Sequence, residues 1–155
     1  MLIIKKVENE IEVEATRNLI RKYAAELQVD LCFQDFENEL ATLPGEYSEP
    51  TGSMLLGYVE GKAVGCVGLR YLKSGICEMK RMYLEPAYRQ NGHGRQLAVA
   101  ILQEASRLGY NKMRLDTLPK LTQALKLYTK LGFYPIAPYY KTPLSETIFM
   151  EINVL

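Results

Sequence analysis

The chain has 155 residues, of which 48% are hydrophobic and 24% charged, and its formal net charge is +1. This length and composition fit a single folded domain over residues 1–155 and exclude a disordered chain. The near-neutral charge argues against nucleic-acid binding, and no stretch of about 20 apolar residues is present to span a membrane. The N-terminus lacks the pattern of a signal peptide, so we expect a cytoplasmic protein.

Cysteine and histidine usage excludes several kinds of catalytic centre. Cys32, Cys66 and Cys77 are odd in number and lack the spacing of metal ligands, so we expect buried, reduced thiols. His93 is the only histidine, which excludes a histidine-rich metal centre. A Ser-His-Asp or Cys-His site would have to use this one residue. We therefore expect no metal.

Hydrophobic periodicity and turn residues divide the chain into strands and helices. The order is a strand, two helices, three antiparallel strands, a helix, a strand, a helix and two strands. This order predicts an α/β (α+β) fold, in which helices cover both faces of a mixed sheet of about seven strands. The predicted strands are Leu2–Val7, Met54–Glu60, Lys62–Tyr71, Ile76–Leu84, Asn111–Leu118, Phe133–Ala137 and Thr147–Val154, and the predicted helices are Glu10–Gln28, Gln34–Thr42, Gly92–Leu108 and Pro119–Leu131.

The strand predicted over Ile76–Leu84 changes phase along its length. Cys77 and Met79 are apolar at odd positions, and Met82 and Leu84 are apolar at even positions, although Ile76 and Tyr83 do not follow this pattern. Because side chains alternate with a period of two, a regular strand cannot place both sets on one face. One extra residue near Lys80 or Arg81, a β-bulge, restores a common face. A bulge would also splay the strand from its neighbour and leave backbone N–H groups for a ligand.

A glycine-containing loop over Arg89–Arg95 follows this strand and opens a predicted helix. The first N–H groups of a helix lack intrahelical partners, and the helix dipole favours negative charge there. Gly92 and Gly94 let the backbone approach phosphate oxygens closely, and the arginines at both ends add positive charge. The loop lacks the Gly-Lys-Ser/Thr of a Walker motif, and Leu97 stands where a dinucleotide fingerprint needs glycine or alanine.

Two motifs resemble those of the GCN5-related N-acetyltransferases, the GNAT superfamily. The segment Met82–Gly94 resembles the central motif, whose loop reads Arg/Gln-x-x-Gly-x-Gly/Ala, and Arg89, Gly92 and Gly94 match it. The segment Ala124–Phe133 resembles the second motif, Ala-x-x-x-Tyr-x-x-x-Gly-Phe. The order of the predicted strands agrees as well, so the resemblance covers nearly the whole chain. It implies the GNAT fold, with a bulged and splayed central strand, and acetyl transfer from acetyl-CoA to an amine.

The resemblance also implies which residues bind the co-substrate. In this family, the loop's N–H groups bind the pyrophosphate of coenzyme A, and the backbone of the bulged strand pairs with the pantetheine arm. One N–H of that strand faces the thioester oxygen, where negative charge develops during transfer. His93 stands at a variable position of the motif, so its expected role is passive. The expected cofactor-binding residues are Met82, Tyr83, Leu84, Arg89, Gln90, Asn91, Gly92, His93, Gly94 and Arg95.

Tyr128 and Glu78 are the catalytic residues that the resemblance suggests. Tyr128 matches the tyrosine that often protonates the departing thiolate in this family, although its helical stripe is also consistent with a purely structural role. Glu78 is the first candidate for the general base, and an ion pair is the alternative for it. Asp116 is the reserve candidate. The sequence departs from the family at Leu121, where an asparagine often contacts the pantetheine.

The acceptor is expected to be a small-molecule amine, and an amino-acid-like metabolite would suit the mixture of basic and aromatic groups. Two alternatives remain open: acetylation of a protein N-terminus or lysine, and an acyl-CoA-binding module without turnover. Homodimerisation is common in the family. The weaker candidates for substrate binding are Tyr47, Arg70, Lys80, Arg81 and Asp116, with Tyr139 and Tyr140 nearby in a predicted loop.

Overall fold

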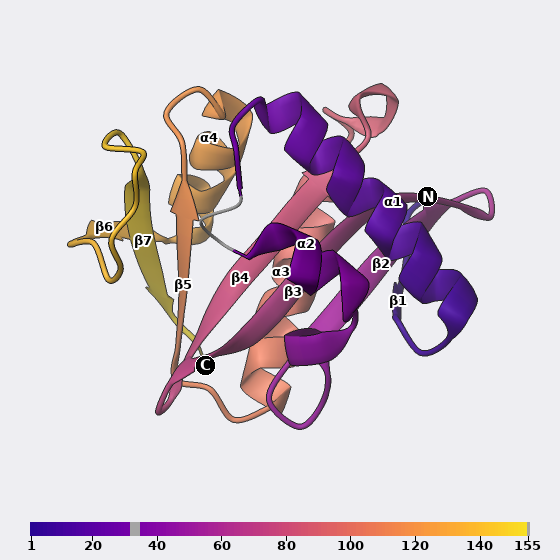
Figure 1. The fold of residues 1–155 in the computed structure, drawn as a ribbon. Helices are drawn as coiled ribbons and strands as arrows, with labels where there is room; N and C mark the ends of the chain where they lie inside the picture. The colour runs from indigo at the N-terminus through magenta and orange to yellow at the C-terminus, as the bar shows by residue number, and fades with distance from the viewer. Residues whose placement is uncertain (32–34, 155) are drawn as a thin grey trace.

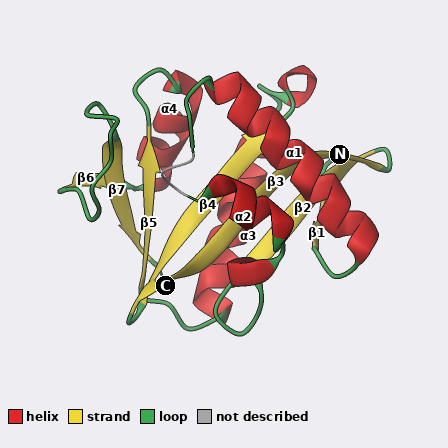
Figure 2. Ribbon diagram, in the orientation of Figure 1, coloured by secondary structure: helices red, strands yellow, loops and turns green. Residues whose placement is uncertain are grey.

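The computed structural model describes residues 1–31 and 35–154 and shows a seven-stranded mixed sheet with helices on both faces (Figures 1 and 2). The strand order is β1-β2-β3-β4-β5-β7-β6. All neighbouring strands are antiparallel except β4 and β5, which are parallel. The strands are β1 (Ile3–Lys6), β2 (Ser53–Val59), β3 (Lys62–Lys73), β4 (Ile76–Leu84), β5 (Lys112–Thr117), β6 (Tyr134–Ile136) and β7 (Ile148–Asn153). The helices are α1 (Glu10–Leu27), α2 (Phe36–Ala41), α3 (His93–Arg107) and α4 (Thr122–Leu131), with 3-10 turns at Gly45–Tyr47 and Pro86–Tyr88.

Two apolar clusters lie on opposite faces of the sheet. Residues of α3 and α4, such as Leu97 and Tyr128, pack on one face against β3, β4 and β5. Residues of α1 and α2, such as Ile20 and Leu40, pack on the other face. Figure 1 shows α1 and α2 lying across β3 and β4 in front of the sheet, with α3 behind it. The predicted arrangement, with helices on both faces, is confirmed. Among the described residues, no helix is long and apolar enough to cross a membrane.

Local sequence signals set most element ends. The side chain of Asn9 accepts a hydrogen bond from the backbone N–H of Glu12 at 2.9 Å and so caps the start of α1. The turn between β2 and β3 has positive φ at Glu60 and Gly61, as a tight hairpin requires. Gly132, at φ +108°, ends α4 in the left-handed conformation.

One sequence prediction needs correction, and two others fall on residues outside the described ranges. The helix predicted to begin at Pro119 begins at Thr122, because the N–H of Leu121 closes a turn onto the carbonyl of Leu118 at 3.0 Å. Gln34, the predicted start of another helix, is outside the described residues, and so is Cys32. The other two cysteines are buried free thiols, as predicted.

Candidate functional site

The phase change in β4 is a β-bulge at Arg81. Cys66 pairs with Tyr83 and Gly68 pairs with Lys80, so β4 advances three residues while β3 advances two. Arg81 has a φ of +58°, a left-handed conformation that side chains rarely adopt. The predicted consequence for the apolar face is confirmed, because the odd-numbered Cys77 and Met79 and the even-numbered Met82 and Leu84 all pack in the cluster on the α3 side.

Beside the bulge, β4 and β5 diverge. Their parallel pairing covers Ile76 to Glu78 on β4 and Lys112 to Arg114 on β5, and within the described residues it extends no further. A cavity lies in the gap beyond this point, and we call it the gap cavity. Its walls come from α1, β4, β5, α4 and the turn before α4. The lining residues are Tyr23, Met79, Lys80, Arg81, Met82, Leu115, Asp116, Thr117, Leu121, Ala124 and Tyr128.

The predicted phosphate loop lies just beyond the open end of β4. Gly92 has a φ of +82° and precedes the first residue of α3. Gln96 is the first residue of α3 whose N–H bonds back, to the carbonyl of Gly92 at 3.1 Å, so the N–H groups of the three residues before it lie ahead of the helical ladder. A Cβ added to Gly92 would meet no atom within 4 Å, so the backbone is open to approach. Gln90 and Asn91 are exposed.

The charged and aromatic residues around this loop have separate places. Arg89 donates from Nε to the carbonyl of Leu84 at 2.8 Å and from its guanidinium to Glu26 at 2.9 Å. Its guanidinium also stacks on the ring of Tyr83, which lies on the α1 side of the sheet. Arg89 therefore anchors the loop to the sheet.

Arg95 and His93 stand at the start of α3. Arg95 is exposed there, so its charge is open to an approaching ligand. The ring of His93 is 3.0 Å from the side-chain oxygen of Gln96 on the same helix, so its contact is local. Glycines thus stand beside the open N–H groups of α3, together with one exposed cation. These features fit a diphosphate in chemical type.

Tyr128 projects from α4 toward the gap cavity. Its side chain is 6% exposed and packs edge-on against Phe133. Burial raises the pKa of the Tyr128 hydroxyl, and the proximity of Tyr23 and Asp116 raises it further. The phenol therefore stays protonated at neutral pH and can donate a hydrogen bond or a proton into the gap. Tyr128, the candidate acid of the sequence analysis, thus lines the gap cavity together with residues of β4.

Glu78 lies at the last residue of the β4–β5 pairing and is 2% exposed. One of its oxygens accepts a hydrogen bond from Arg70 Nε at 3.0 Å, and the other accepts one from the Tyr139 hydroxyl at 2.7 Å. Arg70 also pairs with Glu46 at 3.0 Å. Glu78 is not among the residues that line the gap cavity. It joins β3, β4 and the loop before β7 in one buried network.

The side chain of Arg81 is buried and is held by residues of α2. Its guanidinium makes two hydrogen bonds of 2.8 Å with the carboxylate of Glu39 and stacks on Phe36 at 5.3 Å. The Tyr47 hydroxyl donates to the same carboxylate at 3.0 Å. Burial acts to raise the pKa of Glu39, but the hydrogen bond and the charge of Arg81 outweigh it, so the pKa is lowered. This ion pair holds the bulged residue in place.

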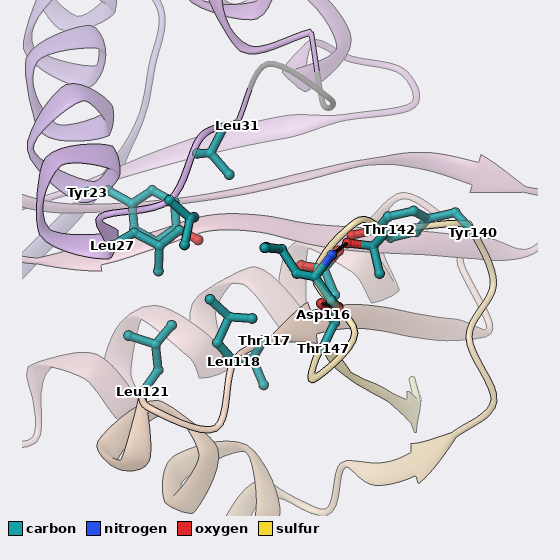
Figure 3. Close-up of a pocket in the computed structure, with 12 residues that line it drawn as sticks. Tyr23, Leu27, Leu31, Asp116, Thr117, Leu118, Leu121, Tyr140, Thr142 and Thr147 are labelled. Atoms are coloured by element: carbon teal, nitrogen blue, oxygen red, sulfur yellow. Dashed lines mark hydrogen bonds between the residues drawn. The ribbon is translucent and has the colours of Figure 1, made fainter.

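Lys80 and Asp116 meet at the gap. Lys80 is 6% exposed, and burial lowers the pKa of its ammonium group, although the charge of Asp116 partly offsets this effect. Asp116, on β5, accepts a hydrogen bond from the Tyr140 hydroxyl. Asp116 lines the gap cavity and also a second pocket, drawn in Figure 3, between the end of α1 and the loop before β7. It is thus the carboxylate shared by both spaces.

Two residues near the site, Tyr23 and Glu39, escaped sequence analysis. Tyr23 lines both spaces, yet in the sequence it is one member of an apolar stripe on α1. Glu39 lies on a short helix 42 residues before its partner Arg81, and no local pattern connects the two. Leu121, noted as a departure from the family motif, lines both spaces as well. The described residues hold no group of three histidine, cysteine or carboxylate side chains arranged to bind a metal.

Comparisons with known proteins agree with this geometry. A sequence model of the acetyltransferase (GNAT) family matches residues 13–133. An uncharacterized N-acetyltransferase of Schizosaccharomyces pombe is 37% identical over 92% of this chain and 89% of its own length. An uncharacterized N-acetyltransferase of Escherichia coli is 33% identical over 77% of this chain and 74% of its own length. The crystal structure of a GNAT acetyltransferase from Staphylococcus aureus superposes with a TM-score of 0.83 at 20% identity and covers 100% of both chains.

Proposed function

Since the chain belongs to the GNAT family of N-acetyltransferases and uses acetyl-CoA, we propose that its acceptor is the primary amine of a small molecule. The observation that carries this proposal is the pair of adjoining spaces at Asp116. One space lies in the gap between β4 and β5. The other is bounded by α1 and the loop before β7, which brings Tyr140 against Asp116. Two small adjoining spaces of this kind suit a compact acceptor.

Different residues of the chain bind acetyl-CoA and assist the transfer of its acetyl group. Bound acetyl-CoA supplies an activated thioester. The exposed N–H groups at the start of α3 bind the diphosphate, and the unpaired backbone of β4 around Met82 holds the pantetheine arm and faces the thioester oxygen. As the amine nitrogen bonds to the acetyl carbon and the carbon–sulfur bond breaks, Tyr128 gives a hydrogen bond or its proton to the leaving sulfur.

A carboxylate must take the proton that the ammonium loses. Glu78 accepts hydrogen bonds at both oxygens and lies outside the lining of the gap cavity, whereas Asp116 lines it. We therefore propose Asp116 as the proton acceptor and retain Glu78 as the competing candidate. Asp116→Asn and Glu78→Gln separate the two, because removal of the base lowers kcat by about 10²-fold or more. The other variant is expected to act mainly through stability, measured as Tm.

An amino-acid-like acceptor draws support from the cations of this face. Arg70 and Arg81 are neutralised in part by Glu78 and Glu39, whereas Lys80 lines the gap cavity itself. A relative from Xenopus tropicalis named N-acetylaspartate synthetase is 29% identical over 68% of this chain, which matches 42% of that protein. Its name describes acetylation of an amino acid.

Titration calorimetry with acetyl-CoA, paired with thiol release over a panel of amines, amino acids and peptides, tests the proposal. We expect saturable binding and thiol release with one class of small amine. Release with peptides alone would replace the proposal with protein acetylation, and binding without any release would indicate a non-catalytic acyl-CoA-binding module. Within the part of the chain that the structure describes, a further cavity beside Pro44 and Tyr47 shares no lining residue with the gap cavity, so it offers no continuous groove that would lead a peptide to it.

A further inference from the structure

The second pocket that Asp116 lines, drawn in Figure 3, is called the acceptor pocket from here on. Half of its twelve lining residues are leucine or valine, which come from the end of α1, the segment after it, the turn before α4 and the loop before β7, and the other half are three threonines, two tyrosines and Asp116. The leucine and valine residues are Leu27, Val29, Leu31, Leu118, Leu121 and Leu144. In the view of Figure 3, Asp116 lies between Leu118 and Tyr140.

The only carboxylate among the residues lining the described acceptor pocket is Asp116. The pocket also shares Tyr23, Thr117 and Leu121 with the gap cavity. A ligand that extends from one space into the other must therefore pass this carboxylate. Its charged end would lie beside Asp116 and the gap, and the remainder would lie among hydrocarbon side chains.

We propose that the acceptor pocket selects primary amines that carry a hydrocarbon substituent, with Asp116 holding the ammonium end at the gap and the leucines enclosing the substituent. This inference rests on the proposed function, because it names the class of acceptor for the same site. The ammonium gains a charged hydrogen-bond partner, which offsets the cost of leaving water. The hydrocarbon gains from leaving water in proportion to its area.

The surrounding charges agree with this assignment. Arg70 and Arg81, the other cations of this face, are paired with Glu78 and Glu39 at 3.0 Å and 2.8 Å. Lys80 lines the gap cavity, and the charge of Asp116 acts on its ammonium group, so Asp116 faces this cation as well as an incoming ammonium. A second charged group on the far end of the acceptor would meet leucine side chains and hydroxyl groups there but, among the described lining residues, no side chain of opposite charge other than Asp116, which already holds the ammonium. The pocket should therefore discriminate against diamines and against acidic amino acids.

Two matched acceptor series test the inference by thiol release at a fixed, saturating acetyl-CoA concentration. One runs from methylamine through propylamine to 3-methylbutylamine, and the other runs from glycine through alanine to leucine. We expect kcat/KM to rise about fourfold for each methylene added. Putrescine and aspartate serve as charged counterparts of similar length and should be poorer acceptors than 3-methylbutylamine and leucine. A flat series, or faster turnover of putrescine or aspartate, would overturn the inference.

A variant at the far wall separates the pocket from the chemistry. Leu144→Ser should lower the ratio of kcat/KM for leucine over glycine by about tenfold, since it removes buried hydrocarbon contact from one acceptor of the pair. Because the readout is a ratio, a general loss of active protein leaves it unchanged. The matched control is Leu102→Ser, a half-buried leucine of α3 that packs on the opposite side of the sheet. An equal change of the ratio in both variants would overturn the assignment of the pocket.

Asp116→Asn provides the third arm. It should raise KM for every acceptor of both series while the affinity for acetyl-CoA, measured by calorimetry, stays the same. An unchanged KM would overturn the role of Asp116 in holding the ammonium. Failure of the proposed function has a different signature, because no amine of any kind would then release thiol. Thiol release that favours hydrophilic acceptors leaves the proposed function standing and refutes only the hydrocarbon preference.

Discussion

From Ile76 to Glu78, β4 is hydrogen-bonded to β3 on one side and to β5 on the other. From Met79 to Leu84, the described pairing is with β3 alone, and a bulge at Arg81 interrupts it. The first end builds the sheet, and the second end exposes backbone groups and lines the gap cavity. Because pairing on both sides fixes the first end of β4, the second end is held in position even though its backbone is not paired with β5.

The phosphate loop beyond the open end should be the most sensitive place. Gly94→Trp places a large side chain in the first turn of α3, where an added Cβ would already lie 3.7 Å from Leu127 and 3.8 Å from Met82. It should weaken acetyl-CoA binding by more than about 100-fold, because each lost hydrogen bond to a charged group costs about 1.5–3 kcal/mol. Calorimetry measures the affinity. Gln103→Trp adds the same side chain at an exposed position of α3 and should bind normally. Normal binding by Gly94→Trp would refute the assignment of the loop.

The bulge itself depends on the ion pair that holds Arg81. Arg81→Met leaves Glu39 buried without its cation and should lower the free energy of unfolding by about 3–5 kcal/mol. Denaturant unfolding measures this loss. The double variant Arg81→Met/Glu39→Leu should recover most of the stability, because both charges are then replaced by apolar groups. If the single variant is as stable as the wild type, the pair does not hold the bulge.

Chemistry at the open end should depend on the phenol of α4. Tyr128→Phe keeps the packing against Phe133 and removes the proton donor, so kcat should fall by about 10²-fold or more. The affinity for acetyl-CoA should be unchanged, as calorimetry can show. Because burial raises the pKa of Tyr128, the wild-type rate should show no loss of this acid between pH 7 and 9. A normal kcat in the variant would assign the acid role to another group.

The same ion pair at the bulge should impose a pH dependence on stability. The pKa of Glu39 is lowered in the folded protein, whereas an unfolded glutamate titrates near about 4.3. The stabilisation by this carboxylate is therefore complete above the unfolded value and is lost as the pH falls through the lower folded value. Unfolding free energies from pH 7 down to pH 3 should show a smaller acid loss in the double variant than in the wild type. Equal losses would contradict the lowered pKa.

The paired end should respond in stability alone. Cys77 is 0% exposed and lies within the segment paired on both sides. Cys77→Ala should lower the free energy of unfolding by about 1 kcal/mol and leave KM for acetyl-CoA unchanged. A large rise in that KM would show that the two ends of β4 are less independent than their pairing implies.

Much of this molecule follows from local sequence patterns. The phase change between Met79 and Met82 predicted the bulge, because strand side chains alternate strictly. Glycine spacing predicted the loop before α3, and helical periodicity placed Tyr128 on α4. The predicted start of α4 at Pro119 was wrong. A proline suits the first turn of a helix, but it also suits a turn that precedes one, and Pro119 lies in such a turn.

The partners of the site residues were decided by the tertiary structure alone. Glu39 reaches Arg81 across 42 positions of sequence, and Tyr139 reaches Glu78 across 61. A local pattern specifies which face a side chain takes, but it carries no information on which distant segment packs against that face. Sequence alone thus determined the family, the bulge and the candidate acid, whereas packing decided that Glu78 is enclosed by partners and that Asp116 faces two cavities, because both outcomes depend on contacts between segments far apart in the chain.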